Sequence, residues 1–138
     1  MKNKEKVSIV LSCIDYRFWP EALPLLEKKY GEFDLIELAG GSKNLSSPTT
    51  EADRKAVLES IKVSVDLHKA KQIILTNHID CGAYGGSKQF KSRNDEITFH
   101  RNELAKAKKI VHANFATLKA ETILLERDEN QNLKLSVT

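Results

Sequence analysis

Residues 72–82 read QIILTNHIDCG, and residues 7–17 read VSIVLSCIDYR. Each stretch begins with a short run of apolar and β-branched residues, which predicts a buried strand. Each predicted strand leads directly into a polar cluster. The side chains of these clusters that can bind a metal or handle protons are Cys13, Asp15, Arg17, His78 and Cys81. The two stretches therefore predict both the centre of the fold and the position of a functional site.

Three further strands are predicted outside these two stretches. Residues 33–38 (FDLIEL) and 121–126 (ETILLE) are short runs rich in apolar residues. Residues 133–137 (LKLSV) alternate apolar with polar side chains, which favours an edge strand with one solvated face. The polar residues 128–132 (DENQN) precede this last run and predict the turn of a hairpin.

Helical signals lie between the strands. Pro20 suits the first turn of a helix that Gly31 can end, and Pro24 predicts that this helix is short or irregular. Residues 50–53 (TEAD) match a capping box that opens a long helix. Its predicted apolar face comprises Val57, Leu58, Ile61 and Val65. A last helix is predicted from about residue 95 to residue 114, with an apolar stripe of Ile97, Leu104, Val111 and Phe115.

Strands that alternate with helices predict an α/β fold, in which a mostly parallel β-sheet of four strands is flanked by helices. The C-terminal hairpin is expected to add a fifth, antiparallel edge strand. We expect residues 1–138 to form a single domain, because a chain of this length supports one core rather than two. In such sheets the site lies beyond the carboxyl ends of the strands, where both polar clusters fall.

Composition and charge exclude several classes of protein. The chain is 41% hydrophobic and 30% charged, as soluble globular proteins are, and no apolar run is long enough to span a bilayer. Its formal net charge is +3, but the lysines are mixed with carboxylates, so we expect neither nucleic acid nor membrane as a partner. The charged start lacks the apolar stretch of a secretory signal. Both cysteines lie in motifs with His, Asp and Arg, which is typical of metal-binding or catalytic thiols rather than of a secreted disulfide framework. A cytoplasmic protein is expected.

Cys13, His78 and Cys81 offer two thiolates and one imidazole, a donor set that suits Zn²⁺ with a fourth position left for water. His78 and Cys81 are three residues apart, whereas Cys13 comes from a much earlier strand. Donors so far apart in the sequence can bind one ion only when the fold brings the strands together. The pattern therefore predicts a catalytic zinc site in a preformed pocket rather than a local zinc finger.

Asp15 and Arg17 are expected to assist this metal. Two thiolates neutralise the charge of the ion and weaken it as a Lewis acid, so the activation of water needs a neighbouring group. Asp15 can accept a hydrogen bond from the metal-bound water, and Arg17 can hold Asp15 ionised through a bidentate contact. Alternatively, Asp15 ligates zinc itself when Arg17 releases it, which closes the site. The two states use the same residues.

The motif pair C-x-D-x-R and H-x-x-C-G, each at a strand end, resembles the β-class carbonic anhydrases. The resemblance covers residues 7–137 and includes the glycine loop that starts at residue 39. It implies that the two thiols and the imidazole bind zinc, that the carboxylate and the guanidinium form the catalytic dyad, and that the chain forms a homodimer or higher homo-oligomer. In this sequence these residues are Cys13, His78, Cys81, Asp15 and Arg17.

The chain departs from the family pattern in two places. Relatives usually carry an N-terminal helical arm that wraps the partner subunit, whereas few residues precede the first predicted strand here. They also commonly show Arg-Asn where this chain has Glu37 and Leu38. These departures concern the wall of the pocket and the dimer, while the expected metal and dyad positions match the family.

The first functional hypothesis is the reversible hydration of carbon dioxide to bicarbonate by a zinc-bound hydroxide, which Asp15 and Arg17 assist. One alternative keeps the centre but hydrolyses carbonyl sulfide or carbon disulfide. Another is a non-catalytic zinc-binding regulatory protein. The remaining histidines, at positions 68, 100 and 112, lack partners at ligand spacing, and the glycine loops match neither the phosphate-binding nor the dinucleotide-binding spacing.

Overall fold

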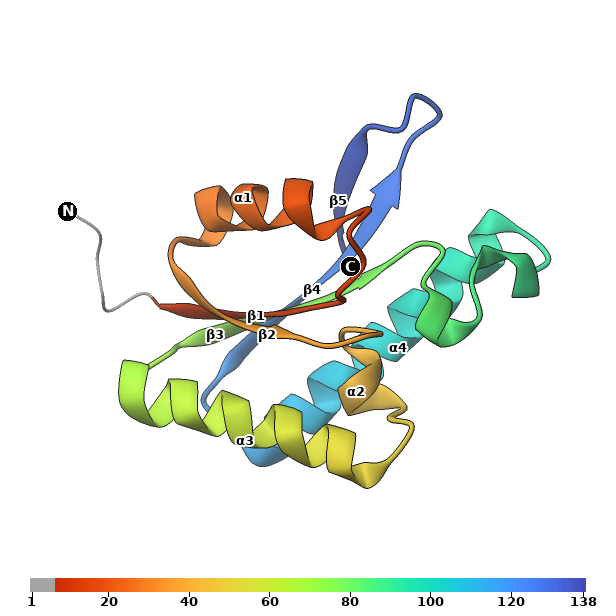
Figure 1. The fold of residues 1–138 in the computed structure, drawn as a ribbon. Coiled ribbons are helices and arrows are strands. Elements are labelled where there is room, and N and C mark those ends of the chain that lie inside the picture. The colour runs from red at the N-terminus through yellow and green to blue at the C-terminus, as the bar shows by residue number, and fades with distance from the viewer. Residues whose placement is uncertain (1–6) are drawn as a thin grey trace.

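The computed structural model describes residues 7–138, and the charged start at residues 1–6 lies outside the described residues. A five-stranded sheet crosses the molecule with helices on both of its faces (Figure 1). The spatial order of the strands is β2-β1-β3-β4-β5. Their bounds are Ser8–Ser12 for β1, Phe33–Glu37 for β2, Gln72–His78 for β3, Lys119–Arg127 for β4 and Leu133–Val137 for β5.

The pairing of the strands confirms the predicted fold class. Strand β1 lies parallel to both β2 and β3, and β3 lies parallel to β4, whereas β5 pairs with β4 in the antiparallel direction. The sheet is therefore mostly parallel, with one antiparallel edge strand from the C-terminal hairpin. Strand β3 continues past its predicted end at residue 76, because its pairing with β4 extends to His78 opposite Leu125.

The sheet separates two apolar layers, each of which lies under one or more helices (Figure 1). Helix α1 covers one face, and helices α2, α3 and α4 cover the other. Ile9 and Leu11 of β1 pack in the larger layer, whereas Val10 between them packs in the layer under α1. Strands buried on both faces read as continuous apolar runs, as β1 and β3 do. The helices are α1 (Trp19–Tyr30), α2 (Lys43–Ser46), α3 (Glu51–His68) and α4 (Arg93–Asn114).

Helix α1 corrects one expectation from the sequence. Pro24 was expected to make this helix short or irregular, yet α1 runs for 12 residues with Pro24 inside it. Ala22 and Leu26 are buried against the sheet, and this burial offsets the backbone hydrogen bond that proline cannot donate. Gly31 ends the helix as expected, at a positive φ of 83°.

The start of α3 corrects a second expectation. Thr50 precedes the helix in extended conformation, as an N-cap residue does, but its side chain makes no capping hydrogen bond. Its backbone carbonyl accepts from the Asp53 amide instead, at 3.1 Å, so the expected capping box is not formed. Helix α4 has the side-chain cap that α3 lacks, because the Ser92 hydroxyl accepts from the Asp95 amide at 3.1 Å.

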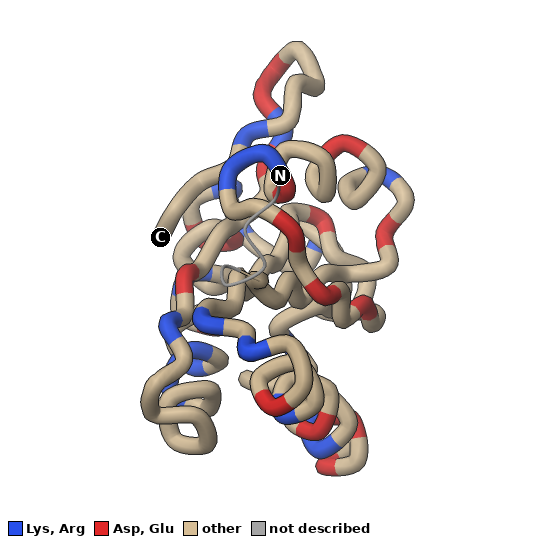
Figure 2. Tube along the Cα trace, turned by 90° about the vertical axis from the view of Figure 1, so that its left-hand side faces the viewer, with Lys and Arg blue, Asp and Glu red and all other residues tan. Residues whose placement is uncertain are grey.

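Charges of both signs are distributed over the molecule (Figure 2). On α3, Lys55 lies 3.9 Å from Glu59 and Lys62 lies 2.5 Å from Asp66, so the basic residues of this helix pair with carboxylates one turn away. Of the helices within residues 7–138, none has the length and apolar character needed to cross a membrane.

Candidate metal centre

Three potential metal donors meet at the carboxyl ends of β1 and β3. Cys13 directly follows β1, His78 is the last residue of β3, and Cys81 lies in the loop that follows. One donor atom from each residue lies within 4.8 Å of the other two, and all three residues are buried. Within residues 7–138, this is the one group of three or more His, Cys, Asp and Glu side chains that is arranged in this way. The structure brings the expected donors together, and their role as ligands stays a prediction.

The His78 ring presents a free lone pair to the two sulfurs. Its Nδ1 lies 2.8 Å from the carbonyl oxygen of Ile79, which can only accept, so Nδ1 carries the proton and donates it. The other nitrogen, Nε2, carries the lone pair of the neutral ring, and it is buried without a hydrogen-bond partner among residues 7–138. A backbone carbonyl that fixes one imidazole nitrogen is also the usual support of a metal-binding histidine. The orphaned nitrogen therefore fits a bound metal ion.

The two sulfurs form an asymmetric pair of thiols. A hydrogen bond from Cys81 lowers the pKa of Cys13, and the Gly40 amide, which donates to the Cys13 sulfur at 3.3 Å, lowers it further. The hydrogen bond to Cys13 raises the pKa of Cys81, and burial raises it further. The hydrogen bond between the two sulfurs therefore favours the thiolate at Cys13 and the thiol at Cys81. A divalent cation with affinity for sulfur would stabilise both as thiolates.

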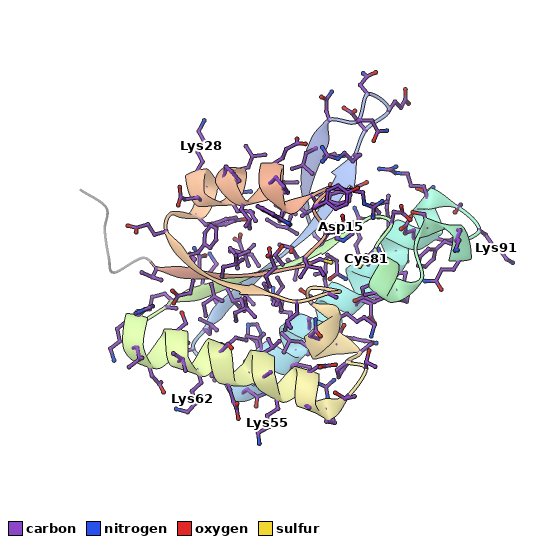
Figure 3. The ribbon with its side chains drawn as sticks, viewed as in Figure 1. Asp15, Lys28, Lys55, Lys62, Cys81 and Lys91 are labelled. Atoms are coloured by element: carbon purple, nitrogen blue, oxygen red, sulfur yellow. The ribbon has the colours of Figure 1, made fainter. Side chains whose placement is uncertain are left out.

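Asp15 and Arg17 lie beside this donor group and contact each other closely. Arg17 Nη2 donates to Asp15 Oδ2 at 2.6 Å, and Arg17 Nε donates to Oδ1 at 3.0 Å. These hydrogen bonds are the main reason why the pKa of Asp15 lies below its usual range, so the carboxylate is ionised at neutral pH. Asp15 Oδ2 lies 3.6 Å from His78 Nε2. Asp15 therefore places an ionised hydrogen-bond acceptor at the edge of the donor group. Figure 3 shows Asp15 and Cys81 at the same end of the sheet.

Phe18 is a neighbour of the site that the sequence did not reveal. Its ring stacks on the His78 ring with centroids 4.4 Å apart and an angle of 26° between the planes. The contact covers one face of the imidazole and limits its rotation. It depends on how the chain turns between β1 and α1, and no sequence motif reports that turn.

Glu37, one of the two departures from the family pattern, also lies near the site. Burial raises its pKa, and the nearby Cys13 thiolate raises it further. Its Oε2 atom is buried and has no hydrogen-bond partner within the described part of the chain, residues 7–138. Position 37 therefore places a partly buried carboxyl group near Cys13.

The other three histidines lie outside the donor group, as expected from their spacing. His100 is fully buried, and burial lowers its pKa to about 4. It is therefore neutral at physiological pH. His68 is the last residue of α3, and its Nδ1 lies 2.7 Å from Oδ2 of Asp34 on β2. His112 is exposed on α4.

The sequence matches a known family over most of its length. Residues 3–132 match the family described as "Putative carbonic anhydrase". An uncharacterized protein of Rickettsia bellii is 32% identical over 130 residues, which cover 90% of this chain and 79% of that protein. An uncharacterized protein of Rickettsia conorii is 31% identical over 129 residues, which cover 90% of this chain and 69% of that protein.

Solved structures show the same fold. The carbonic anhydrase from Glaciozyma antarctica has a TM-score of 0.61 at 15% identity, over 98% of this chain and 83% of that chain. A β-carbonic anhydrase of Trichomonas vaginalis has a TM-score of 0.58 at 15% identity, over 99% and 85% of the two chains. One of two tetrameric β-carbonic anhydrases from Sordaria macrospora has a TM-score of 0.56 at 16% identity, over 95% and 81%. The fold is that of the β-carbonic anhydrases, which confirms the resemblance drawn from the two motifs.

Gly41 tests how tightly the loop after β2 packs against the ends of β1 and β3. A Cβ atom at Gly41 would lie 2.8 Å from the Thr76 carbonyl oxygen and 3.2 Å from the Cys13 amide nitrogen. Gly31 also has a positive φ, but a Cβ atom there would meet nothing within 4 Å. Gly41→Ala is therefore expected to lower the free energy of unfolding by about 1–3 kcal/mol more than Gly31→Ala does. Urea unfolding measures both losses, and equal losses would refute the close packing.

Proposed function

This chain belongs to the carbonic anhydrase family that it matches, and from that premise we propose that it catalyses the reversible hydration of carbon dioxide to bicarbonate. Cys13, His78 and Cys81 would hold one Zn²⁺ ion. The observation that carries the proposal is the buried, unpartnered Nε2 of His78, which lies with two sulfurs beside an ionised carboxylate.

The donor set supports zinc rather than a hard cation. Two thiolates and an imidazole suit Zn²⁺, whereas Mg²⁺ and Ca²⁺ take oxygen ligands. When bound, such an ion supplies Lewis acidity, which lowers the pKa of a water molecule toward neutral. The reaction adds the oxygen of water to the carbon of carbon dioxide and releases one proton, so that the products are bicarbonate and a proton.

Asp15 is proposed to orient the attacking water. Its carboxylate can only accept hydrogen bonds while ionised, and Arg17 keeps it ionised and fixed in the observed bidentate contact. Oδ2, at 3.6 Å from His78 Nε2, is the oxygen nearer the donor group. A water molecule that donates to this oxygen would direct its lone pairs away from the carboxylate, toward an incoming carbon atom. Arg17 acts on the reaction through Asp15.

The proposed assembly is a homodimer or a higher homo-oligomer. A structural neighbour from Sordaria macrospora is tetrameric, and Leu35 on the edge strand β2 is 44% exposed, which leaves apolar surface on that edge. The cytoplasm is the proposed location, because two free thiols at a metal site persist best in a reducing compartment.

The metal assignment predicts a definite zinc content. The purified protein is expected to hold one zinc ion per chain by atomic absorption, and Cys81→Ser is expected to lose it because a weakly acidic hydroxyl replaces a thiolate. Ser64→Ala, a buried polar residue on α3 outside the donor group, serves as the control and is expected to keep the metal. Zinc-free wild-type protein, or a Cys81→Ser variant with full zinc content, would refute the assignment.

The role of Asp15 predicts a separation of binding from catalysis. Asp15→Ala is expected to retain zinc but to lower kcat/KM for carbon dioxide hydration by roughly 100-fold or more, as the loss of a positioned proton-handling group does. Asp66→Asn is the matched control, because Asp66 is an exposed carboxylate that pairs with Lys62. Stopped-flow hydration with a pH indicator measures both variants. An Asp15→Ala rate equal to that of the control would remove Asp15 from the mechanism.

The same assay distinguishes the alternatives. Rates for carbon dioxide, carbonyl sulfide and carbon disulfide identify the substrate, because all three are small linear electrophiles that the donor group alone does not separate. A zinc-loaded wild-type protein that accelerates none of them would instead be the non-catalytic zinc-binding protein.

A further inference from the structure

Hydrogen bonds hold the Arg17 side chain, whose guanidinium also lies over the Phe18 ring, 5.9 Å from its centroid. The side chain is 44% exposed, and a long exposed side chain has many accessible rotamers. Four of its five N–H groups donate to only two residues, Asp15 and Asp80. Nη1 donates to Asp80 Oδ2 at 2.9 Å, and Nη2 donates to the Asp80 backbone carbonyl oxygen, also at 2.9 Å. The guanidinium therefore lies between two carboxylates.

Asp80 itself is held by contacts that do not involve Asp15. Its amide donates to Glu96 Oε2 at 2.8 Å, and its Oδ1 accepts from the Ser87 amide at 2.8 Å. The Ser87 hydroxyl also donates to Glu96, which is 2% exposed in the first turn of α4. These bonds connect the loop between His78 and Cys81 to the start of α4. Asp80 is thus a fixed support, whether or not Asp15 stays in place.

The backbone of Asp80 supports a dedicated role for this residue. Its φ is +60°, a left-handed conformation that costs about 1–2 kcal/mol for most residues and less for Asp and Asn. This conformation lets one residue present both its carbonyl oxygen and its carboxylate to the same guanidinium. A residue in regular strand or helix conformation would direct the two groups differently.

Solvent reaches the Arg17–Asp80 contact from one side. Both residues line a cavity of about 650 Å³ whose other walls come from Phe18 just before α1, from Ile79, from the start of α4 and from the C-terminal hairpin. Water in this cavity would compete for the Nη atoms if Asp80 were absent. Asp15 and the backbone carbonyl at position 80 would then be the remaining acceptors for the guanidinium, and neither accepts from Nη1.

We infer that Asp80 is a positioning residue, which holds Arg17 so that Arg17 can orient Asp15 and which keeps holding Arg17 when Asp15 turns away. The inference rests on the proposed function, because it assigns Asp80 a task in that mechanism. Asp80 acts through Arg17 and is not a catalytic residue.

The test uses two variants of Asp80 in the full zinc-loaded chain. Asp80→Asn keeps a residue that tolerates the left-handed conformation and an oxygen that can accept from Ser87, but it removes the charge that faces Arg17. Asp80→Gly removes the side chain while the backbone conformation and its carbonyl remain accessible. Asp66→Asn is again the matched control, since it also removes one carboxylate that pairs with a basic side chain.

The first readout is NMR of the Arg17 guanidinium, assigned by its loss in Arg17→Lys. Restricted rotation about the bond to Nη1 is expected in the wild type, in Asp66→Asn and in Asp15→Ala. This rotation is expected to become fast in Asp80→Gly, which removes the acceptor of Nη1, whereas Nη2 keeps Asp15 and the backbone carbonyl as acceptors. Fast rotation in Asp15→Ala together with restricted rotation in Asp80→Gly would overturn the inference, because Asp15 would then be the residue that holds Arg17.

The second readout is kinetic. Asp80→Asn is expected to lower kcat about tenfold, at the lower end of the range for a hydrogen bond to a charged group, and to leave KM within about twofold. A kcat equal to that of Asp66→Asn, or a loss confined to KM, would overturn the positioning role. If the wild type hydrates no carbon dioxide, the proposed function fails, and the NMR readout still decides whether Asp80 holds Arg17.

Discussion

The parallel pairing of β1 with β3 is the constraint on which the rest of the structure depends. The pairing runs from Ser8 opposite Gln72 to Leu11 opposite Leu75, so the two strands end side by side. The Thr76 hydroxyl donates to the Leu11 carbonyl oxygen at 2.7 Å and fixes the last step of this register. A slip of two residues would move one strand end by about 6.6 Å, too far for donors from both strands to share an ion.

Burial explains why this register is well defined. Ile73 and Leu75 of β3 face the layer under α3 and α4, whereas Ile74 faces the layer under α1, and all three are fully buried. A slip of one residue would turn each side chain to the opposite face. Packing on both faces therefore fixes the register of the strands, and the register places the sulfurs and the imidazole. The core thus fixes Cys13 and His78 at the strand ends, and the loop after β3 adds Cys81.

The sequence alone predicted the features that follow from apolar runs and from motifs at their ends. The parallel sheet, the antiparallel edge strand and the meeting of Cys13 with His78 and Cys81 belong to this group, because strand ends in a parallel sheet lie at one edge. The left-handed conformation of Asp80 and the stacking of Phe18 could not be predicted in this way. Both depend on the path of a few backbone dihedral angles between elements, which composition and spacing do not encode.

The central claim is that three side chains from two strand ends hold one zinc ion with a position left for solvent. Zinc-edge X-ray absorption of the purified protein tests it most directly. The account predicts two sulfur ligands at about 2.3 Å and two lighter ligands at about 2.0–2.1 Å. A shell of oxygen and nitrogen alone, or one of four sulfurs, would contradict it.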